Sequence, residues 1–166
     1  MILQYFKKKE NEYKDVADRI YLIILHKSKK LIKKNYFEEV NFNSSFELIS
    51  ILLIFYLNIN EENNYNNYKK INDELVKNFI NDLDKTIREI GIGDMLIGKY
   101  VKKYVKKFYY RIKIIDPILK NFSDRDFIVF LKSLKSIDKK NTKKMANDLL
   151  GIYQEIKKKA CYKDKN

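Results

Sequence analysis

Turn-forming residues are scarce in this sequence: its 166 residues include one proline and four glycines. A β-sandwich or a β-barrel needs many tight turns, and glycine and proline are the residues that such turns favour. The scarcity therefore argues against an all-β fold and leaves an all-α fold as the expectation. The chain also holds one cysteine and one histidine, which excludes a disulfide framework and any zinc site built from several thiolates or imidazoles.

Length and composition favour one globular domain. Hydrophobic residues make up 45% of the chain and aromatic residues 14%, which is too apolar for a disordered protein. A chain of this length buries roughly 70% of its extended surface on folding. We therefore expect a single-domain, all-α bundle of about six to seven amphipathic helices. The expected divisions are a flexible basic N-terminus at 1–12, a helical domain at 13–158 and a polar C-terminal tail at 159–166.

Apolar residues recur at helical spacing along most of the chain. The helices expected from this pattern cover residues 13–34, 44–59, 73–90, 95–113, 124–136 and 142–158. Ser44 and Glu47 have the spacing of a capping box at the start of the second helix. Gly91 suits the left-handed position that ends the third helix, and Asp94 suits the N-cap of the fourth. Pro117 is expected to break the chain after that fourth helix.

Two stretches bear on loops and membranes. The polar residues 60–72 are expected to form the one long internal loop. The longest apolar run, residues 48–57, has about half the length that crosses a bilayer, so no transmembrane helix is expected.

The charge is large but unevenly distributed. The formal net charge is +13, and all but four of the 35 basic residues are lysines. Proteins that read nucleic acids commonly use arginine for bidentate contacts, so this charge is only weak support for an anionic partner, and no DNA partner is expected. Residues 60–96 hold eight acids and five bases, whereas residues 97–120 hold one acid and eight bases. An acidic helix followed by a basic one is therefore expected, with a glycine-containing turn between them.

The turn does not have the pattern of a catalytic or nucleotide-binding site. A dinucleotide-binding loop follows a strand, but here a helix precedes the glycines, and no Gly-Lys-Ser/Thr sequence ends the loop. Asp82, Glu89 and Asp94 are the carboxylates near the turn, and a hydrolase built on them would require a bound metal. No nucleophile or histidine accompanies them. We therefore expect a non-enzyme with no catalytic residue, no metal and no cofactor.

One string of residues resembles a known family. Residues 82–94 read Asp-Leu-Asp-Lys-Thr-Ile-Arg-Glu-Ile-Gly-Ile-Gly-Asp, with Gly-Lys-Tyr-Val-Lys-Lys at 98–103 and Phe-Tyr at 108–109. This string resembles the signature of the ubiquinol–cytochrome c chaperone family, whose members are assembly factors for cytochrome b of the respiratory quinol–cytochrome c reductase. Two positions depart from the family pattern: Ser45 replaces an arginine, and Tyr110 replaces a glycine. The first change removes an expected ion-pair partner, and the second puts a bulky ring where a close helix approach is expected.

The resemblance implies an assembly chaperone that binds newly made cytochrome b. The client- or partner-binding residues that it implies are Asp82, Asp84, Arg88, Glu89, Gly91, Gly93 and Asp94. A basic face for lipid, ribosome or an acidic partner would comprise Lys99, Lys102, Lys103, Lys106, Lys107 and Arg111. Further expected partners are the ribosome, a small co-chaperone and an anionic membrane surface. The expected location is the cytoplasm or the cytoplasmic face of the inner membrane, or the mitochondrial matrix in a eukaryote.

A different class of function also accounts for the charge. The alternative is a small basic helical module that binds RNA or the ribosome and uses the lysine face as its whole site. The two hypotheses differ in salt dependence, because affinity for bare RNA falls steeply with ionic strength.

Overall fold

The computed structural model describes the backbone of residues 2–63 and 67–163 and, within these, the side chains from residue 12 to residue 160. These ranges form helices and no named strand; Phe37 and Ile137 make an isolated antiparallel bridge. The helices are Ile2–Ile32 (α1), Phe42–Glu62 (α2), Tyr68–Glu89 (α3), Asp94–Lys120 (α4), Asp124–Ser133 (α5) and Thr142–Lys163 (α6). The predicted single-domain, all-α bundle is confirmed.

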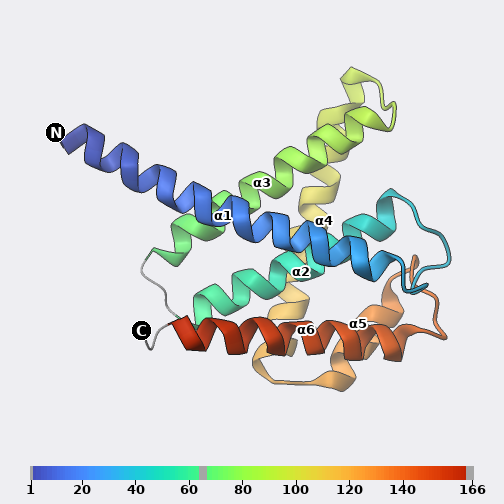
Figure 1. Ribbon diagram of the computed structural model, residues 1–166. Coiled ribbons are helices and arrows are strands. Elements are labelled where there is room, and N and C mark those ends of the chain that lie inside the picture. Colours follow the sequence, from blue (N-terminus) through green and yellow to red (C-terminus); the bar gives the residue numbers. More distant parts are fainter. Residues whose placement is uncertain (1, 64–66, 164–166) are drawn as a thin grey trace.

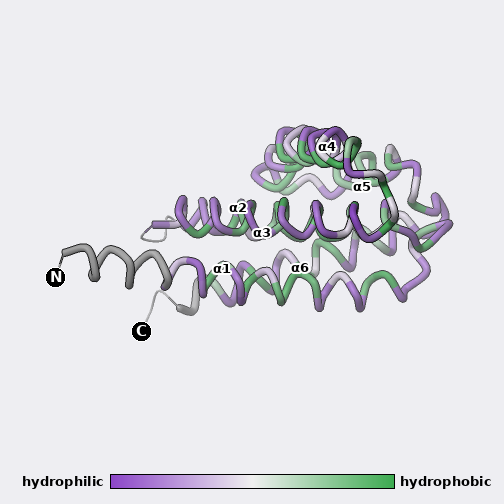
Figure 2. The backbone as a smooth tube through the Cα atoms, turned by 90° about the horizontal axis from the view of Figure 1, so that it is seen from above, coloured by the Kyte–Doolittle hydropathy of each residue, from purple (hydrophilic) through white to green (hydrophobic). Residues whose placement is uncertain are grey.

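Helix α2 is the centre of the bundle. It packs against α1, α3, α4 and α6, and Figure 2 shows α2 and α3 between a layer that contains α1 and α6 and a layer that contains α4. By length and composition α2 could cross a membrane, yet most of its apolar window is buried inside the bundle. This burial is what a core helix that is hydrophobic on nearly all sides requires.

The start of α2 differs from the prediction. Asn41 is the N-cap, and its side chain accepts hydrogen bonds from the backbone amides of Asn43 and Ser44. Ser44 is three residues further on, and its hydroxyl accepts a hydrogen bond from the Asn41 amide at 2.8 Å. The capping box therefore begins three residues earlier than predicted, and Glu47 is not part of it.

Other helix ends also lie outside their predicted bounds. Helix α1 begins at Ile2, well before residue 13, and α6 continues to Lys163. The expected loop at 60–72 is much shorter, because α2 runs to Glu62 and α3 begins at Tyr68; residues 64–66 lie outside the described ranges. Two asparagines of this stretch link α2 to α3, since the Asn60 amide donates to Asn72 at 2.8 Å.

Pro117 does not break the fourth helix. It lies inside α4, which continues to Lys120. Proline removes one backbone donor from the helix, but Ile115 and Leu119 on either side are buried. The burial of these two side chains keeps the last turn helical.

The observed helix bounds also change the net charge assigned to the third helix. Two of the acids counted in residues 60–96, Glu61 and Glu62, belong to α2, and Asp94 belongs to α4. Helix α3 itself carries five acidic and five basic residues, so the prediction of an acidic third helix is wrong. Helix α4 is basic, with eight basic and two acidic residues.

Candidate functional site: the α3–α4 elbow

The turn between α3 and α4 is a sharp elbow at one end of the molecule (Figure 1). Helix α3 ends at Glu89, Ile90 is its C-cap, and Gly91 follows with φ of +82°. The Gly91 amide donates to the Arg88 carbonyl at 3.1 Å. Because side chains other than glycine rarely adopt this left-handed conformation, Gly91 ends α3 as predicted.

The start of α4 is capped differently from the prediction. Gly93 is the N-cap and supplies no side-chain hydrogen bond, while Asp94 is the first residue of the helix. The prediction of Asp94 as N-cap is therefore wrong by one residue. Its carboxylate still lies in the first turn, where negative charge interacts favourably with the helix dipole.

An ion-pair bridge joins the two arms of the elbow. The Arg88 Nε donates to Asp84 Oδ2 at 2.7 Å within α3, and Arg88 Nη1 lies 3.5 Å from Asp94 Oδ1 at the start of α4. The hydrogen bond that Arg88 donates to Asp84 is the main reason why the pKa of Arg88 is raised above its usual value. The Asp94 side chain is 93% exposed, so these ionic groups are open to a partner and are not sealed in the core.

Three large apolar side chains at the elbow are also exposed. Met95 is 99% exposed, and Ile90 and Leu96 are about half exposed. Sequence reasoning did not single them out. Helical periodicity could have indicated that Met95 is exposed. Met95 lies 200° around the helix from Ile97, whose side chain is buried in the core.

The structure separates the predicted client-binding residues. Asp84, Arg88, Gly91, Gly93 and Asp94 meet at the elbow, and Glu89 is exposed at the end of α3.

Asp82 instead lies half-buried and accepts a hydrogen bond from the Tyr21 hydroxyl of α1 at 2.9 Å. It therefore links α3 to α1. Burial of the Tyr21 hydroxyl raises the pKa of Tyr21, and the negative charge of Asp82 raises it further. The described residues contain no group of three or more His, Cys, Asp or Glu placed to hold a metal.

Most of the predicted basic face is solvent-exposed. The lysines at positions 99, 102, 103 and 106 are exposed along α4. Lys107 is only partly exposed, and its Nζ donates to Glu47 Oε1 at 3.0 Å. The exposed part of the basic face is therefore a row of four lysines that starts one turn after Met95.

Arg111 does not belong to this face, which corrects the prediction. It is 2% exposed, and its Nη2 lies 2.5 Å from Oε2 of the equally buried Glu47. Burial lowers the pKa of Arg111, and the Glu47 carboxylate partly offsets this effect. Helical spacing could have indicated the burial of Arg111. It is three residues after Phe108 and four before Ile115, both of which are buried, so all three share one helix face.

Tyr110, which replaces the glycine of the family pattern, also differs from expectation. Its side chain is 65% exposed. The ring therefore takes no space at a helix interface, and the expected conflict with a close helix approach is wrong.

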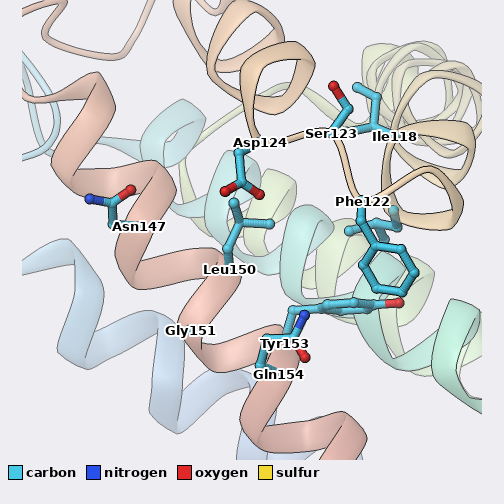
Figure 3. A pocket seen from close by; sticks show the side chains of 10 residues that line it. Ile118, Phe122, Ser123, Asp124, Asn147, Leu150, Gly151, Tyr153 and Gln154 are labelled. Atoms are coloured by element: carbon cyan, nitrogen blue, oxygen red, sulfur yellow. The ribbon is translucent and has the colours of Figure 1, made fainter.

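A hollow of about 350 Å³ lies far from the elbow, at the other end of α4 (Figure 3). Phe122 and Ser123 line one side, and Gly151 and Tyr153 of α6 line the other. Phe122 has φ of +50°, and the ammonium of Lys157 lies 4.9 Å from the centre of its ring. This hollow shares no residue with the predicted site.

The comparisons with known proteins agree with the motif at the elbow. The sequence profile of the ubiquinol-cytochrome C chaperone family matches residues 38–133, which is more than half of the chain and includes the whole elbow. The chain belongs to this family. Among solved structures, the chain is similar to the crystal structure of the Cbp3 homolog from Brucella abortus, with a TM-score of 0.75 and 21% sequence identity. The match covers 95% of this chain and 88% of the other. The comparison with curated proteins gave no match.

Membership of the family agrees with the chemistry of the site. A chaperone family implies a non-enzymatic role, and the elbow offers exposed charged and apolar side chains for binding. The fold of the Brucella homolog extends over α1 and α6 as well, beyond the residues that the family profile matches.

Proposed function

We propose that this protein is an assembly chaperone that binds newly made cytochrome b during the biogenesis of the quinol–cytochrome c reductase. The observation that carries the proposal is the family-matching elbow, where exposed charged and apolar side chains lie together at one end of the bundle. An unassembled membrane subunit exposes apolar surface next to charged loops, and a binding site for it needs both kinds of side chain.

The elbow suits binding because its shape is held from both sides. Arg88 is bonded to Asp84 on its own helix and to Asp94 on the next, and Gly91 sets the turn. Restraining a binding surface before contact reduces the entropy lost on association. Asp94 and Met95, adjacent and almost fully exposed, are then the groups that contact the client.

Charge reversal at Arg88 tests the proposal. Arg88→Glu breaks the bridge between α3 and α4 and places like charges beside Asp84 and Asp94. We expect the variant to fold, because Arg88 is exposed, and to lose co-purification with cytochrome b and lower its accumulation in cells. Arg125→Glu, at an exposed site on α5, is the matched control and should behave as the wild type. A folded Arg88→Glu variant with normal cytochrome b accumulation would contradict the proposal.

The proposed location is the cytoplasm or the cytoplasmic face of the inner membrane. Lysines near an anionic lipid surface contribute about 1 kcal/mol each to membrane attraction, and four exposed lysines follow one another along α4. The ribosome and a small co-chaperone remain proposed partners of the same face. Flotation with anionic vesicles at low and high salt measures the membrane contact.

One observation favours the second candidate function, binding of RNA. Tyr109 and Tyr110 are exposed beside the lysines of α4, and aromatic rings next to cations form stacking platforms for single-stranded nucleic acid. This candidate predicts tight binding to bare RNA that weakens steeply with salt and survives Arg88→Glu. Assembly-chaperone function predicts that cytochrome b binding depends on Arg88.

A further inference from the structure

A groove lies along the inner parts of α2, α3 and α4, away from the elbow. Its volume is about 520 Å³. The apolar side chains that line it are Ile54, Leu57, Val76, Ile80, Tyr109 and Ile112. Most of them are only partly buried, and Tyr109 is about half exposed at the edge. The groove therefore offers an apolar surface that the bundle itself leaves uncovered.

Acidic side chains surround this apolar surface. Glu61 of α2, Asp73 of α3 and Asp116 of α4 lie in its lining. Asp116 already accepts a hydrogen bond from Asn58 at 2.7 Å and pairs with Lys120 at 2.7 Å. Glu61 and Asp73 are exposed, and among the described residues neither lies within ion-pair distance of a cation. Lys120, which pairs with Asp116, is close enough to Glu61 for that charge to contribute to its raised pKa.

The groove is acidic in a chain that is strongly basic overall. Its lining includes one cation, Lys77, which is bonded to Glu74 at 2.6 Å. The chain as a whole carries a net charge of +13. A ligand attracted by the average charge of the protein would be an anion, whereas a ligand that fits this groove must be apolar with positive charge beside it.

We propose that the groove binds a helical segment of a partner protein that is apolar along one face and carries lysine or arginine at its end. A helix in an apolar groove is a common mode of peptide recognition. The end of a transmembrane helix has this composition, because lysine and arginine are concentrated in the cytoplasmic loops next to membrane-spanning segments. The inference rests on the proposed function in that it names the part of the client that is held.

The groove and the elbow share two helices. Ile80 of the groove is ten residues before Ile90, the C-cap of α3, which corresponds to about 15 Å along a helix. The carboxylates of the groove make an anionic lipid headgroup or an RNA phosphate an unfavourable ligand, because like charges repel. The apolar floor and the acidic edge of the groove therefore both favour a helix that is apolar along one face and basic at its end.

Two synthetic helical peptides test the proposal with the full-length chain. Both contain the same leucine- and alanine-rich core; one ends in three lysines and the other in three glutamates. Fluorescence anisotropy gives their affinities, and methyl chemical shifts of Val76, Ile80 and Ile112 locate the binding. We expect the lysine peptide to bind at least about tenfold more tightly, although the net charge of the protein favours the glutamate peptide.

Charge reversal supplies the matched variants. Glu61→Lys combined with Asp73→Lys should weaken the binding of the lysine peptide about tenfold, which is about 1.4 kcal/mol, and strengthen that of the glutamate peptide. The reason is that two attractive charge pairs become repulsive for the lysine peptide. Glu38→Lys, an exposed acid on the segment before α2, is the control and should leave both affinities unchanged.

Three results would overturn the inference: equal affinity for both peptides, no binding of either, or chemical shifts confined to methyls outside the groove. Co-purification of cytochrome b is scored separately with the same double variant. If the peptide test fails while cytochrome b still co-purifies with the wild type, the groove is wrong and the chaperone function stands. If the lysine peptide binds but no cytochrome b co-purifies, the function is wrong and the groove stands.

Discussion

The same substitution, glycine to alanine, should have opposite effects on stability at two positions that are seven residues apart. Gly91 ends α3 with φ of +82°, whereas Gly98 lies in the interior of α4. A methyl group added at either position meets no atom within 4 Å. Steric clash is therefore absent at both sites, and only the backbone conformation distinguishes them.

The expected free-energy changes follow from that difference. Alanine in the left-handed conformation costs roughly 1–2 kcal/mol, so Gly91→Ala should lower the free energy of unfolding by that amount. Alanine in a helix interior is better than glycine by roughly 0.5–1 kcal/mol, so Gly98→Ala should raise it. The two variants should then differ by roughly 1.5–3 kcal/mol, which is the sum of the two effects.

Urea unfolding followed by circular dichroism at 222 nm measures both values. The slope of free energy against urea should be the same for both variants and the wild type, because the surface exposed on unfolding is unchanged. If both variants shift stability in the same direction, the left-handed elbow at Gly91 is wrong.

Two further predictions concern ion pairs elsewhere in the bundle. Arg111→Met should lower the free energy of unfolding by about 1.5–3 kcal/mol, because the buried Glu47 carboxylate then keeps only the partly exposed Lys107 as a cation. Adding Glu47→Gln should restore most of the loss in urea unfolding, and a single-variant cost below about 0.5 kcal/mol would contradict this. The pKa of Asp148 is lowered from 3.8 by hydrogen bonds from Lys34 and Tyr36, so its ionised form stabilises the fold above pH 3.8 and that stability is lost as the pH falls through the lowered value. Asp148→Asn should therefore lose less stability than the wild type between pH 6 and pH 3, and equal losses would refute the assignment.

Local signals in the sequence were sufficient for most helices and for the elbow. Gly91 was recognisable because it follows an amphipathic segment and only a left-handed residue fits there. The helix class followed from periodicity and from the scarcity of turn residues. Residues whose roles depend on their immediate neighbours in the chain were thus accessible from sequence.

Residues whose roles depend on tertiary contacts could not be assigned from the sequence. Glu47 has the spacing of a capping residue, but its carboxylate is used by Arg111, which lies 64 positions later in the chain. Asp82 has the same local surroundings as Asp84, and only the position of Tyr21 on α1 makes it a structural link. Pro117 is tolerated because of what its neighbours pack against. For Glu47 and Pro117 the competing local preference is worth about 1–3 kcal/mol, and burial of Glu47 and of the neighbours of Pro117 outweighs it.

The groove was also beyond local reasoning. Its acids come from three helices, α2, α3 and α4, and no segment of the sequence brings Glu61, Asp73 and Asp116 together. Counting charge along the chain indicated an acidic region at 60–96, but it assigned that charge to one helix. The folded chain divides the acids of residues 60–96 among three helices, and two of these acids, Glu61 and Asp73, lie at the groove.

Photo-crosslinking from position 95 tests the central claim most directly. A photoreactive amino acid replaces Met95, which is almost fully exposed at the elbow, and the control replaces Val129, which is exposed on α5. Irradiation of cells that are making cytochrome b should give a crosslink to newly made cytochrome b from position 95 and none from position 129. Crosslinks of equal yield from both positions, or none from position 95 in cells where the wild-type protein co-purifies with cytochrome b, would contradict the account.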